Sequence, residues 1–187
     1  MLNNAVILAG GKSSRMGEDK ALMPFGGYST MTEYQYRRLE KIFKNVYISA
    51  KDNKFDFEAN IILDKYPQSS PMVAIASILE ELNDDFFLIS VDMPLLSEDA
   101  IKALIDLYNK EPEYDIYVLK SPNGDEPTAT IYTKKIINQI KEFLEQNIHK
   151  LQYLINSVDK VSIIWDNISE FININDKKSY NYAKKQK

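Results

Sequence analysis

The chain has 187 residues, which suits one domain able to bury a sizeable core, and we expect a single domain over residues 1–187. With 44% hydrophobic and 27% charged residues, the composition argues against general disorder. The formal net charge of −4 argues against nonspecific nucleic-acid binding, which requires a broad basic surface. The chain contains no cysteine, so disulfides, thiol nucleophiles and thiolate metal ligands are excluded.

No segment of the sequence has the pattern of an export signal or a membrane anchor. The first apolar run begins within five residues of Met1, which leaves no room for a signal peptide. No apolar stretch approaches the ~20 residues that a membrane-spanning helix needs. We therefore expect a cytoplasmic protein that binds neither membranes nor nucleic acids.

The most informative segment follows the apolar run at residues 5–9, which predicts a short buried strand. Two adjacent glycines, Gly10 and Gly11, let the backbone turn sharply and approach a ligand closely, because no Cβ stands in the way. Three cations arrive shortly afterwards, namely Lys12, Arg15 and Lys20. A strand, a glycine turn and spaced cations together predict a cradle for a polyphosphate.

Known phosphate-binding fingerprints do not match this segment. The P-loop pattern requires a glycine where Val6 stands, and the dinucleotide pattern requires a spacing that adjacent glycines lack. The alternative is a surface turn that uses glycine only for its geometry. The added Arg-Met-Gly-x-Asp-Lys pattern favours the phosphate interpretation over that turn.

Apolar runs alternate with segments of helical periodicity almost from end to end. Strands are expected at 5–9, 46–50, 61–63, 86–91, 116–119, 128–132, 161–165 and 171–174. Helices are expected from Ser29 or Thr30 to about 43, from Pro71 to about 82, from Ser97 to about 108, at about 134–147, and after Asp176. The alternation predicts an α/β fold, a three-layer α/β/α sandwich around a Rossmann-like, mostly parallel sheet.

Two carboxylates directly follow predicted strands, where open parallel sheets bind their ligands. Asp92 follows the buried run at 86–91, and beside a phosphate cradle we interpret it as a ligand of Mg²⁺, with substrate oxygens and water completing the shell. The alternative is that Asp92 is a turn or N-cap residue before Pro94. Asp64 follows the run at 61–63; it suits hydrogen bonds to a base or ribose, or simply closes the strand.

Other polar and aromatic residues have plainer explanations. Asn173 and Asn175 alternate with apolar neighbours as in a half-buried strand. Asn175 can contact a metal or ligand, but we interpret it as the cap of the last helix. His149 is the only histidine and has no evident catalytic partner, so we expect a surface or helix-end position. Trp165 falls within a strand pattern, where packing explains it.

The segment Leu8-Ala-Gly-Gly-x-Ser-x-Arg-Met-Gly-x-Asp-Lys20 resembles the signature of nucleotidyltransferases in the molybdenum cofactor guanylyltransferase (MobA) family. Val91-Asp-Met-Pro94 looks like that family's metal-binding element, and Glu126-Pro127 falls near its substrate-side proline motif. Phe171-Ile-Asn-Ile-Asn175 looks like its C-terminal strand. The matches come in family order and span nearly the whole chain. The resemblance implies a fold like that of nucleotide-diphospho-sugar transferases and transfer of GMP from GTP to the terminal phosphate of molybdopterin, releasing pyrophosphate.

The resemblance also implies roles by position. The residues that it assigns to nucleotide binding are Leu8, Ala9, Gly10, Gly11, Lys20, Ser49, Asp64 and Asp92. Lys20 is implied to contact the phosphates, and Ser49 and Asp64 to lie near the base and ribose. Arg15, Lys20 and Asp92 are the implied catalytic set, with Asp92 holding Mg²⁺. The implied partners are GTP, molybdopterin and, transiently, proteins of molybdenum insertion or molybdoenzyme maturation.

The chain departs from the family pattern at several positions. Ser70 and Ala74 stand where the family has glycine, Ser49 where asparagine is commoner, and Asp176-Lys177 where Thr-Pro is usual. None of these removes the phosphate or metal residues. They leave open a related cytidylyltransferase acting on molybdopterin or on a sugar or polyol phosphate. A non-catalytic GTP-sensing module is a second alternative.

Overall fold

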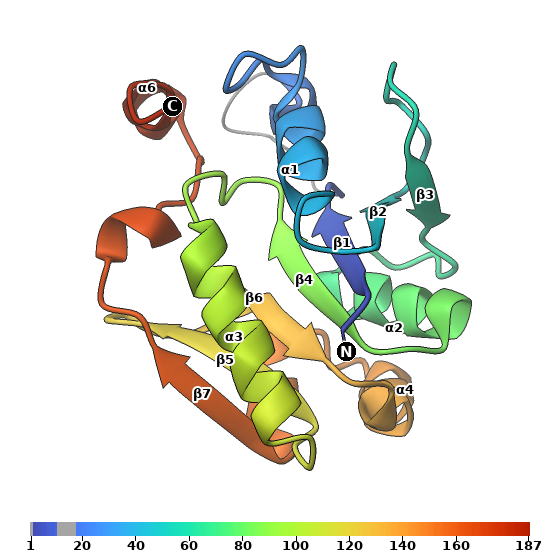
Figure 1. Cartoon of the computed structure of the whole chain (residues 1–187). Coiled ribbons are helices and arrows are strands. Elements are labelled where there is room, and N and C mark those ends of the chain that lie inside the picture. The colour runs from blue at the N-terminus through green and yellow to red at the C-terminus, as the bar shows by residue number, and fades with distance from the viewer. Residues whose placement is uncertain (1, 11–17) are drawn as a thin grey trace.

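A central sheet runs through the computed structural model, which describes residues 2–10 and 18–187 (Figure 1). The strands are β1 (Asn4–Leu8), β2 (Asn45–Ala50), β3 (Asn60–Leu63), β4 (Phe86–Ser90), β5 (Ile116–Ser121), β6 (Gly124–Tyr132) and β7 (Lys160–Ile164). The helices are α1 (Met31–Leu39), α2 (Pro71–Leu82), α3 (Glu98–Lys110), α4 (Ile137–Glu145), α5 (Leu151–Ser157) and α6 (Lys177–Lys184). Three short 3-10 helices complete the described elements: η1 (Lys20–Leu22), η2 (Lys134–Ile136) and η3 (Ile168–Phe171).

The strands of the described residues lie in the order β3-β2-β1-β4-β6-β5-β7. The first four strands along the chain are mutually parallel, β5 and β7 are also parallel, and β6 runs antiparallel to β4 and β5. The mostly parallel sheet predicted from the sequence is confirmed. Because β1 to β4 point the same way, their carboxyl ends share one edge of the sheet.

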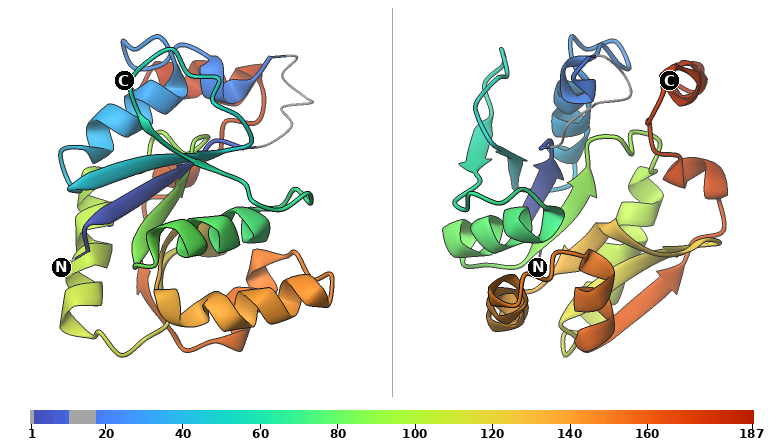
Figure 2. Two further views of the ribbon diagram at one scale, coloured as in Figure 1. Left: turned by 90° about the vertical axis from the view of Figure 1, so that its right-hand side faces the viewer. Right: turned by 180° about the vertical axis from the view of Figure 1, so that it is seen from behind.

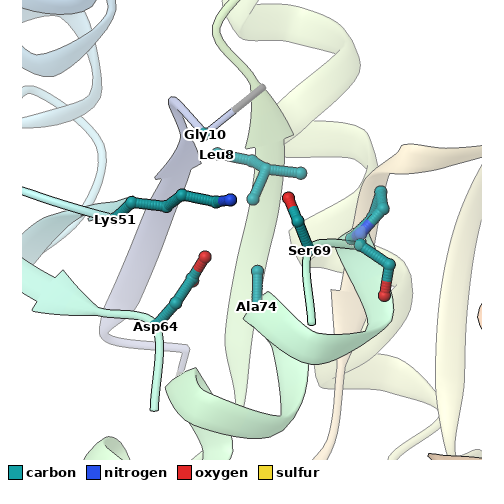
Figure 3. Close-up of a pocket in the computed structure, with 8 residues that line it drawn as sticks. Leu8, Gly10, Lys51, Asp64, Ser69 and Ala74 are labelled. Atoms are coloured by element: carbon teal, nitrogen blue, oxygen red, sulfur yellow. The ribbon is translucent and has the colours of Figure 1, made fainter. Parts of the chain in front are cut away.

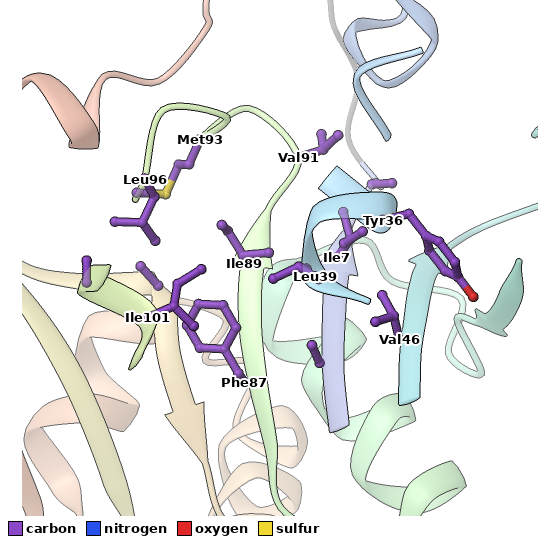
Figure 4. Packing of buried hydrophobic residues seen from close by; sticks show 14 of the residues in the cluster. Ile7, Tyr36, Leu39, Val46, Phe87, Ile89, Val91, Met93, Leu96 and Ile101 are labelled. Carbon is purple, nitrogen blue, oxygen red and sulfur yellow. The ribbon is translucent and has the colours of Figure 1, made fainter. Parts of the chain in front are cut away.

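Helices cover both faces of the sheet, as two views from other sides show (Figure 2). Alternate side chains of β1 enter opposite cores: Ile7 packs in the cluster that includes residues of α1 and α3, and Val6 in the cluster that includes residues of α2, α4 and α5. Leu39 of α1 belongs to the same buried cluster as Ile7 and Ile89 (Figure 4). The expected three-layer sandwich is therefore present.

Local sequence signals place several helix starts correctly. Thr30, Ser70 and Ser97 each accept a hydrogen bond from the backbone N–H three residues later, at 3.0, 3.2 and 3.2 Å. Pro71 occupies the first turn of α2, where its missing N–H has no intrahelical partner to lose. The range predicted for this helix, 71–82, agrees with the structure.

The strand predicted at 171–174 is wrong. Phe171 ends η3, and the backbone N–H of Ile174 donates to the carbonyl of Asp92 at 2.9 Å, in the loop after β4. Phe171 and Ile174 are both buried in the cluster beneath α1 and α3. Their alternation with polar residues thus reflects the packing of an irregular segment, which needs no strand partner to bury its apolar side chains.

Two further outcomes concern the second half of the chain. Helix α5 has only seven residues, too few for a clear periodic signal, and no prediction covered it.

Trp165 is half-buried against the core and donates to Glu170 at 3.1 Å, so the packing role predicted for it is confirmed. No helix in the described part of the chain is long and apolar enough to span a membrane.

Candidate functional site

The carboxyl ends of β1, β2 and β4 meet at one rim of the sheet. Leu8, Ser49 and Ser90 lie at the same level of their three strands. The carbonyl of Leu8 accepts a hydrogen bond from Val91 at 3.1 Å, and the N–H of Ala9 donates to the carbonyl of Ser49 at 3.0 Å. The end of the opening strand and the segment that carries Asp92 are thus directly bonded, as their shared edge predicts.

A cavity of about 420 Å³ opens at this rim (Figure 3). The residues that line it are Leu8, Gly10, Lys51, Asp64, Ser69, Ser70, Pro71 and Ala74. Lys51 and Asp64, which follow the neighbouring strands β2 and β3, extend into the pocket from one side with their charged ends close together, while Leu8 and Ala74 supply apolar walls (Figure 3). A pocket with apolar walls and a few convergent polar groups is typical of a small-molecule site.

Asp64 is held in this pocket by its backbone, and part of its carboxylate is unsatisfied. Its N–H donates to the carbonyl of Ala50 at 3.1 Å, which continues the pairing of β2 with β3. Its Oδ1 is buried and has no hydrogen-bond partner among the described residues. Burial raises the pKa of Asp64, and the nearby Lys51 ammonium opposes that shift. A ligand hydroxyl or N–H that donates to this oxygen would therefore offset its desolvation penalty.

Gly10 leaves open space at the mouth of the pocket. A Cβ built at this position would meet no described heavy atom within 4 Å. Since nothing that the structure describes crowds Gly10, packing does not demand a glycine there. The open space beside Gly10 would let a ligand approach the backbone closely.

A second polar cluster lies at the end of β4. Lys20 Nζ is 2.9 Å from Asp92 Oδ2 and 3.0 Å from Asn175 Oδ1, and the hydroxyl of Ser90 donates to Asp92 Oδ1 at 2.6 Å. The side chains of Lys20 and Asp92 are 17% and 19% exposed, so solvent or a ligand can reach the pair. Next to Lys20, Asp19 caps η1 by accepting from Ala21 at 3.0 Å, which fixes the short helix that carries the lysine.

The donor atoms around Lys20 suit a hard cation. A carboxylate oxygen and an amide oxygen, from Asp92 and Asn175, already converge on its positively charged ammonium group. No group of three or more His, Cys, Asp or Glu side chains able to hold a metal occurs among the described residues. A site with one carboxylate fits Mg²⁺, which keeps several waters and completes its shell with substrate phosphates.

The structure places most of the residues singled out from the sequence at this rim. Leu8, Gly10 and Asp64 line the pocket, and Lys20 and Asp92 form the second cluster. Ala9 and Ser49 also lie at the ends of β1 and β2 but are buried, at 3% and 0% exposure. Ser49 does not line the pocket, and its hydroxyl has no hydrogen-bond partner in the described part of the chain. Gly11 and Arg15 lie outside the described residues, so their roles stay predictions.

Asn175 lies beside Lys20 and does not cap the last helix. The cap of α6 is Asp176, which accepts from the N–H of Ser179 at 2.7 Å in a capping box. The interpretation of Asn175 as that cap is therefore wrong, and its side chain contacts Lys20 instead. A possible contact with a metal or ligand, the other option for Asn175, agrees with this position.

Lys51 and His149 complete the surroundings of the pocket. Lys51 was not identified from the sequence. It directly follows β2, and parallel strands bind ligands beyond their carboxyl ends, so its position could have indicated a site residue. His149 lies just before α5, and its Nδ1 is 3.1 Å from the hydroxyl of Ser70, the cap of α2. The helix-end position expected for His149 is thus confirmed, and it supports a residue that lines the pocket.

The family model described as a MobA-like NTP transferase domain matches residues 5–161. A molybdenum cofactor guanylyltransferase of Campylobacter jejuni subsp. doylei is 35% identical over 186 residues, which cover 98% of this chain and 96% of that protein. A molybdenum cofactor guanylyltransferase of Helicobacter pylori strain P12 is 35% identical over 185 residues, covering 95% and 90% of the two chains.

The fold also has a solved counterpart. The crystal structure of molybdopterin-guanine dinucleotide biosynthesis protein A from Archaeoglobus fulgidus matches with a TM-score of 0.81 and covers 98% of this chain and 97% of that chain. Its sequence identity is 17%, so this likeness bears on the fold. The predicted nucleotidyltransferase-type α/β fold is confirmed.

Proposed function

The chain belongs to the MobA-like NTP transferase domain family of nucleotidyltransferases, and from this premise we propose that it is a molybdenum cofactor guanylyltransferase. It transfers GMP from GTP to the terminal phosphate of molybdopterin and releases pyrophosphate. The observation that carries this proposal is identity of about 35% over nearly the full length of relatives with that name. The pocket of about 420 Å³ and the cluster of Lys20 and Asp92 on the same rim support the proposal.

One nucleotide would lie along this rim. Its base and ribose occupy the pocket between Leu8 and Ala74, with the ribose or base donating to Asp64. Its phosphates extend toward Lys20, which lies at the other end of the rim beside Asp92. Gly10 lies at the mouth of the pocket, where the absence of a Cβ leaves room for the chain to approach the nucleotide. Arg15 is proposed to face the phosphates or the pterin, as its motif implies.

The reaction needs alignment and charge neutralisation more than covalent catalysis. An oxygen of the acceptor's terminal phosphate attacks the α-phosphorus, a new P–O bond forms, and the bond from the α-phosphorus to the bridging oxygen breaks as pyrophosphate leaves with the electron pair. Lys20 holds the triphosphate for this attack and offsets the negative charge that develops. A cation about 4 Å from a phosphate oxygen contributes roughly 4 kcal/mol at an effective dielectric of about 20, before desolvation reduces it.

Mg²⁺ is the metal that we propose for this site. Asp92 and Asn175 would hold it, and when bound it would neutralise phosphate charge and orient the leaving pyrophosphate. The ammonium of Lys20 now lies between those oxygens. When the nucleotide binds together with Mg²⁺, Lys20 would therefore leave Asp92 and contact the nucleotide phosphates.

Base preference is tested by measuring the thermal stability of the protein with each of the four nucleoside triphosphates, with and without Mg²⁺. A preferred ligand raises the melting temperature by mass action, and we expect the largest increase for GTP with Mg²⁺. A larger increase with CTP would favour the cytidylyltransferase alternative, which the names of the relatives do not favour. Tight GTP binding without transfer to molybdopterin would instead favour a GTP-sensing module.

The wider setting follows from the same proposal. We propose that residues 1–187 act as one functional domain, since Lys20 near one end of the chain and Asn175 near the other share a site. The enzyme would work in the cytoplasm, where the absence of cysteine agrees with a reducing environment. Its product would pass to proteins of molybdenum insertion or molybdoenzyme maturation.

A further inference from the structure

Helix α1 carries a row of buried polar side chains that faces the proposed site. Thr32, Gln35 and Arg38 recur every third residue, so they lie along one side of the helix. Their exposed fractions are 0%, 0% and 7%. Polar residues with so little exposure are uncommon in a helix that packs against a sheet, and they require partners.

Each of the three side chains donates to a backbone carbonyl in a segment that bears a proposed site residue. Thr32 Oγ1 donates to Ala21 at 2.7 Å, directly after Lys20. Gln35 Nε2 donates to Ser90 at 3.3 Å, and Arg38 Nη1 donates to Pro94 at 3.0 Å. The last two carbonyls lie two residues before and two residues after Asp92. One helix face therefore binds both segments whose side chains meet at the ion pair of Lys20 and Asp92.

Burying these polar side chains lowers the free energy of unfolding relative to apolar side chains of similar size. The Nε and Nη2 atoms of Arg38 and the Oε1 atom of Gln35 are buried and make no geometrically sound hydrogen bond to the described residues, although the Arg38 guanidinium lies over the Tyr34 ring, 5.9 Å from its centroid. Burial lowers the pKa of Arg38, although Tyr34, Glu98 and Glu170 act electrostatically in the opposite direction. A buried charge costs desolvation free energy that an apolar side chain of similar volume would not cost. A helix selected only for packing would thus have apolar residues here, as it does at Met31 and Leu39.

We propose that Thr32, Gln35 and Arg38 are positioning residues that hold Lys20 and Asp92 at the spacing a metal-bound triphosphate requires. The inference rests on the proposed function, because Lys20 and Asp92 have this task only in nucleotide transfer. The three residues contact no substrate themselves. They fix the backbone on each side of the reacting cluster, as outer-shell hydrogen bonds fix the ligands of a metal.

Arg38 offers the sharpest test, because the same helix provides a matched control. Arg38→Met keeps the apolar stem and removes the hydrogen bond to Pro94. Arg38→Lys keeps a cationic donor. Arg37→Met makes the same chemical change at the neighbouring position, where the arginine pairs on the helix surface with Glu33 and Glu40. Gln35→Met removes the bond to Ser90 and provides a second variant if Arg38→Met does not fold.

The measurement is the Mg²⁺ concentration that gives half-maximal stabilisation of each variant by GTP, followed by thermal unfolding. We expect Arg38→Met and Gln35→Met to need roughly 10- to 100-fold more Mg²⁺ than the wild-type protein, with Arg38→Lys recovering part of the shift. Arg37→Met should match the wild type. A merely structural residue would change the melting temperature without moving the Mg²⁺ midpoint, and that result would overturn the inference.

Hydrogen exchange separates this inference from the proposed function. The backbone amides of residues 90–93 should exchange faster in Arg38→Met than in Arg37→Met, whether or not GTP binds. If the wild-type protein shows no Mg²⁺-dependent stabilisation by GTP, the proposed nucleotide site fails. Equal amide exchange at residues 90–93 in the two variants would instead refute the positioning role.

Discussion

At the scale of single residues, Asp92 carries the metal end of the proposed site. Its two carboxylate oxygens accept from Ser90 and Lys20, so the side chain is already oriented toward the rim. We expect Asp92→Asn to lower the Mg²⁺-dependent transfer rate by roughly 100-fold or more, as loss of a preorganised charge at a reacting phosphate does, while the fold persists. Steady-state transfer assays and circular dichroism check this.

A matched control is available on α3. Asp106 is an exposed carboxylate of that helix, and Asp106→Asn changes the net charge by the same amount. It should turn over like the wild type. Near-normal turnover of Asp92→Asn would remove the metal assignment, whichever way the control behaves.

The raised pKa of Asp64 predicts that nucleotide binding depends on pH. Burial raises the pKa of its carboxyl group, so the free protein takes up a proton there at a higher pH than an ordinary aspartate would. Only the ionised carboxylate accepts hydrogen bonds with both oxygens. Affinity for the nucleotide should therefore fall as the pH is lowered from neutral through this raised pKa, and binding should release a proton in that range.

Calorimetry of GTP binding at several pH values measures this effect. Asp64→Asn removes the titrating group, so the variant should bind more weakly at neutral pH and lack this part of the pH dependence. Titration of the nucleotide phosphates is the same for both proteins and cancels in the comparison. Parallel pH profiles for the two proteins would show that Asp64 does not bind the nucleotide.

At the scale of elements, helix α2 forms one wall of the pocket through Ser70, Pro71 and Ala74. Ser70 caps this helix by accepting from the N–H of Val73 at 3.2 Å. Ser70→Ala should lower the free energy of unfolding by about 1 kcal/mol, whereas Ser70→Gly should lower it by only a few tenths. Urea denaturation measures both values. Ser69→Ala, at the exposed neighbouring position, is the control and should have no comparable effect.

The elements that could be predicted are those whose signals are local. Pro71 and the preceding serine mark the start of α2, and its apolar periodicity runs to residue 82, so both ends were predicted correctly. The segment at 171–174 shows where this reasoning fails. Its alternation fits a strand, but whether a strand forms depends on a neighbouring backbone, and in the fold Phe171 and Ile174 are buried by packing alone.

At the scale of the whole molecule, the site joins segments that the sequence keeps far apart. Lys20 and Asn175 are separated by 155 positions, yet their side chains are 3.0 Å apart. Strand order alone could place Asp64 and Asp92 at one edge, because each follows a parallel strand. It could not place Asn175, which lies in an irregular segment that returns over the rim, nor reveal the buried face of α1. Those positions depend on tertiary packing.

In the proposed reaction a single GTP reaches from the pocket at Asp64 to the pair formed by Lys20 and Asp92. The most direct measurement supplies the protein with Mg²⁺, GTP labelled at the α-phosphate and molybdopterin, and follows both products. We predict that labelled GMP becomes joined to molybdopterin and that an equal amount of pyrophosphate is released. GTP that binds but yields neither product, with the acceptor present, would contradict guanylyl transfer at this site.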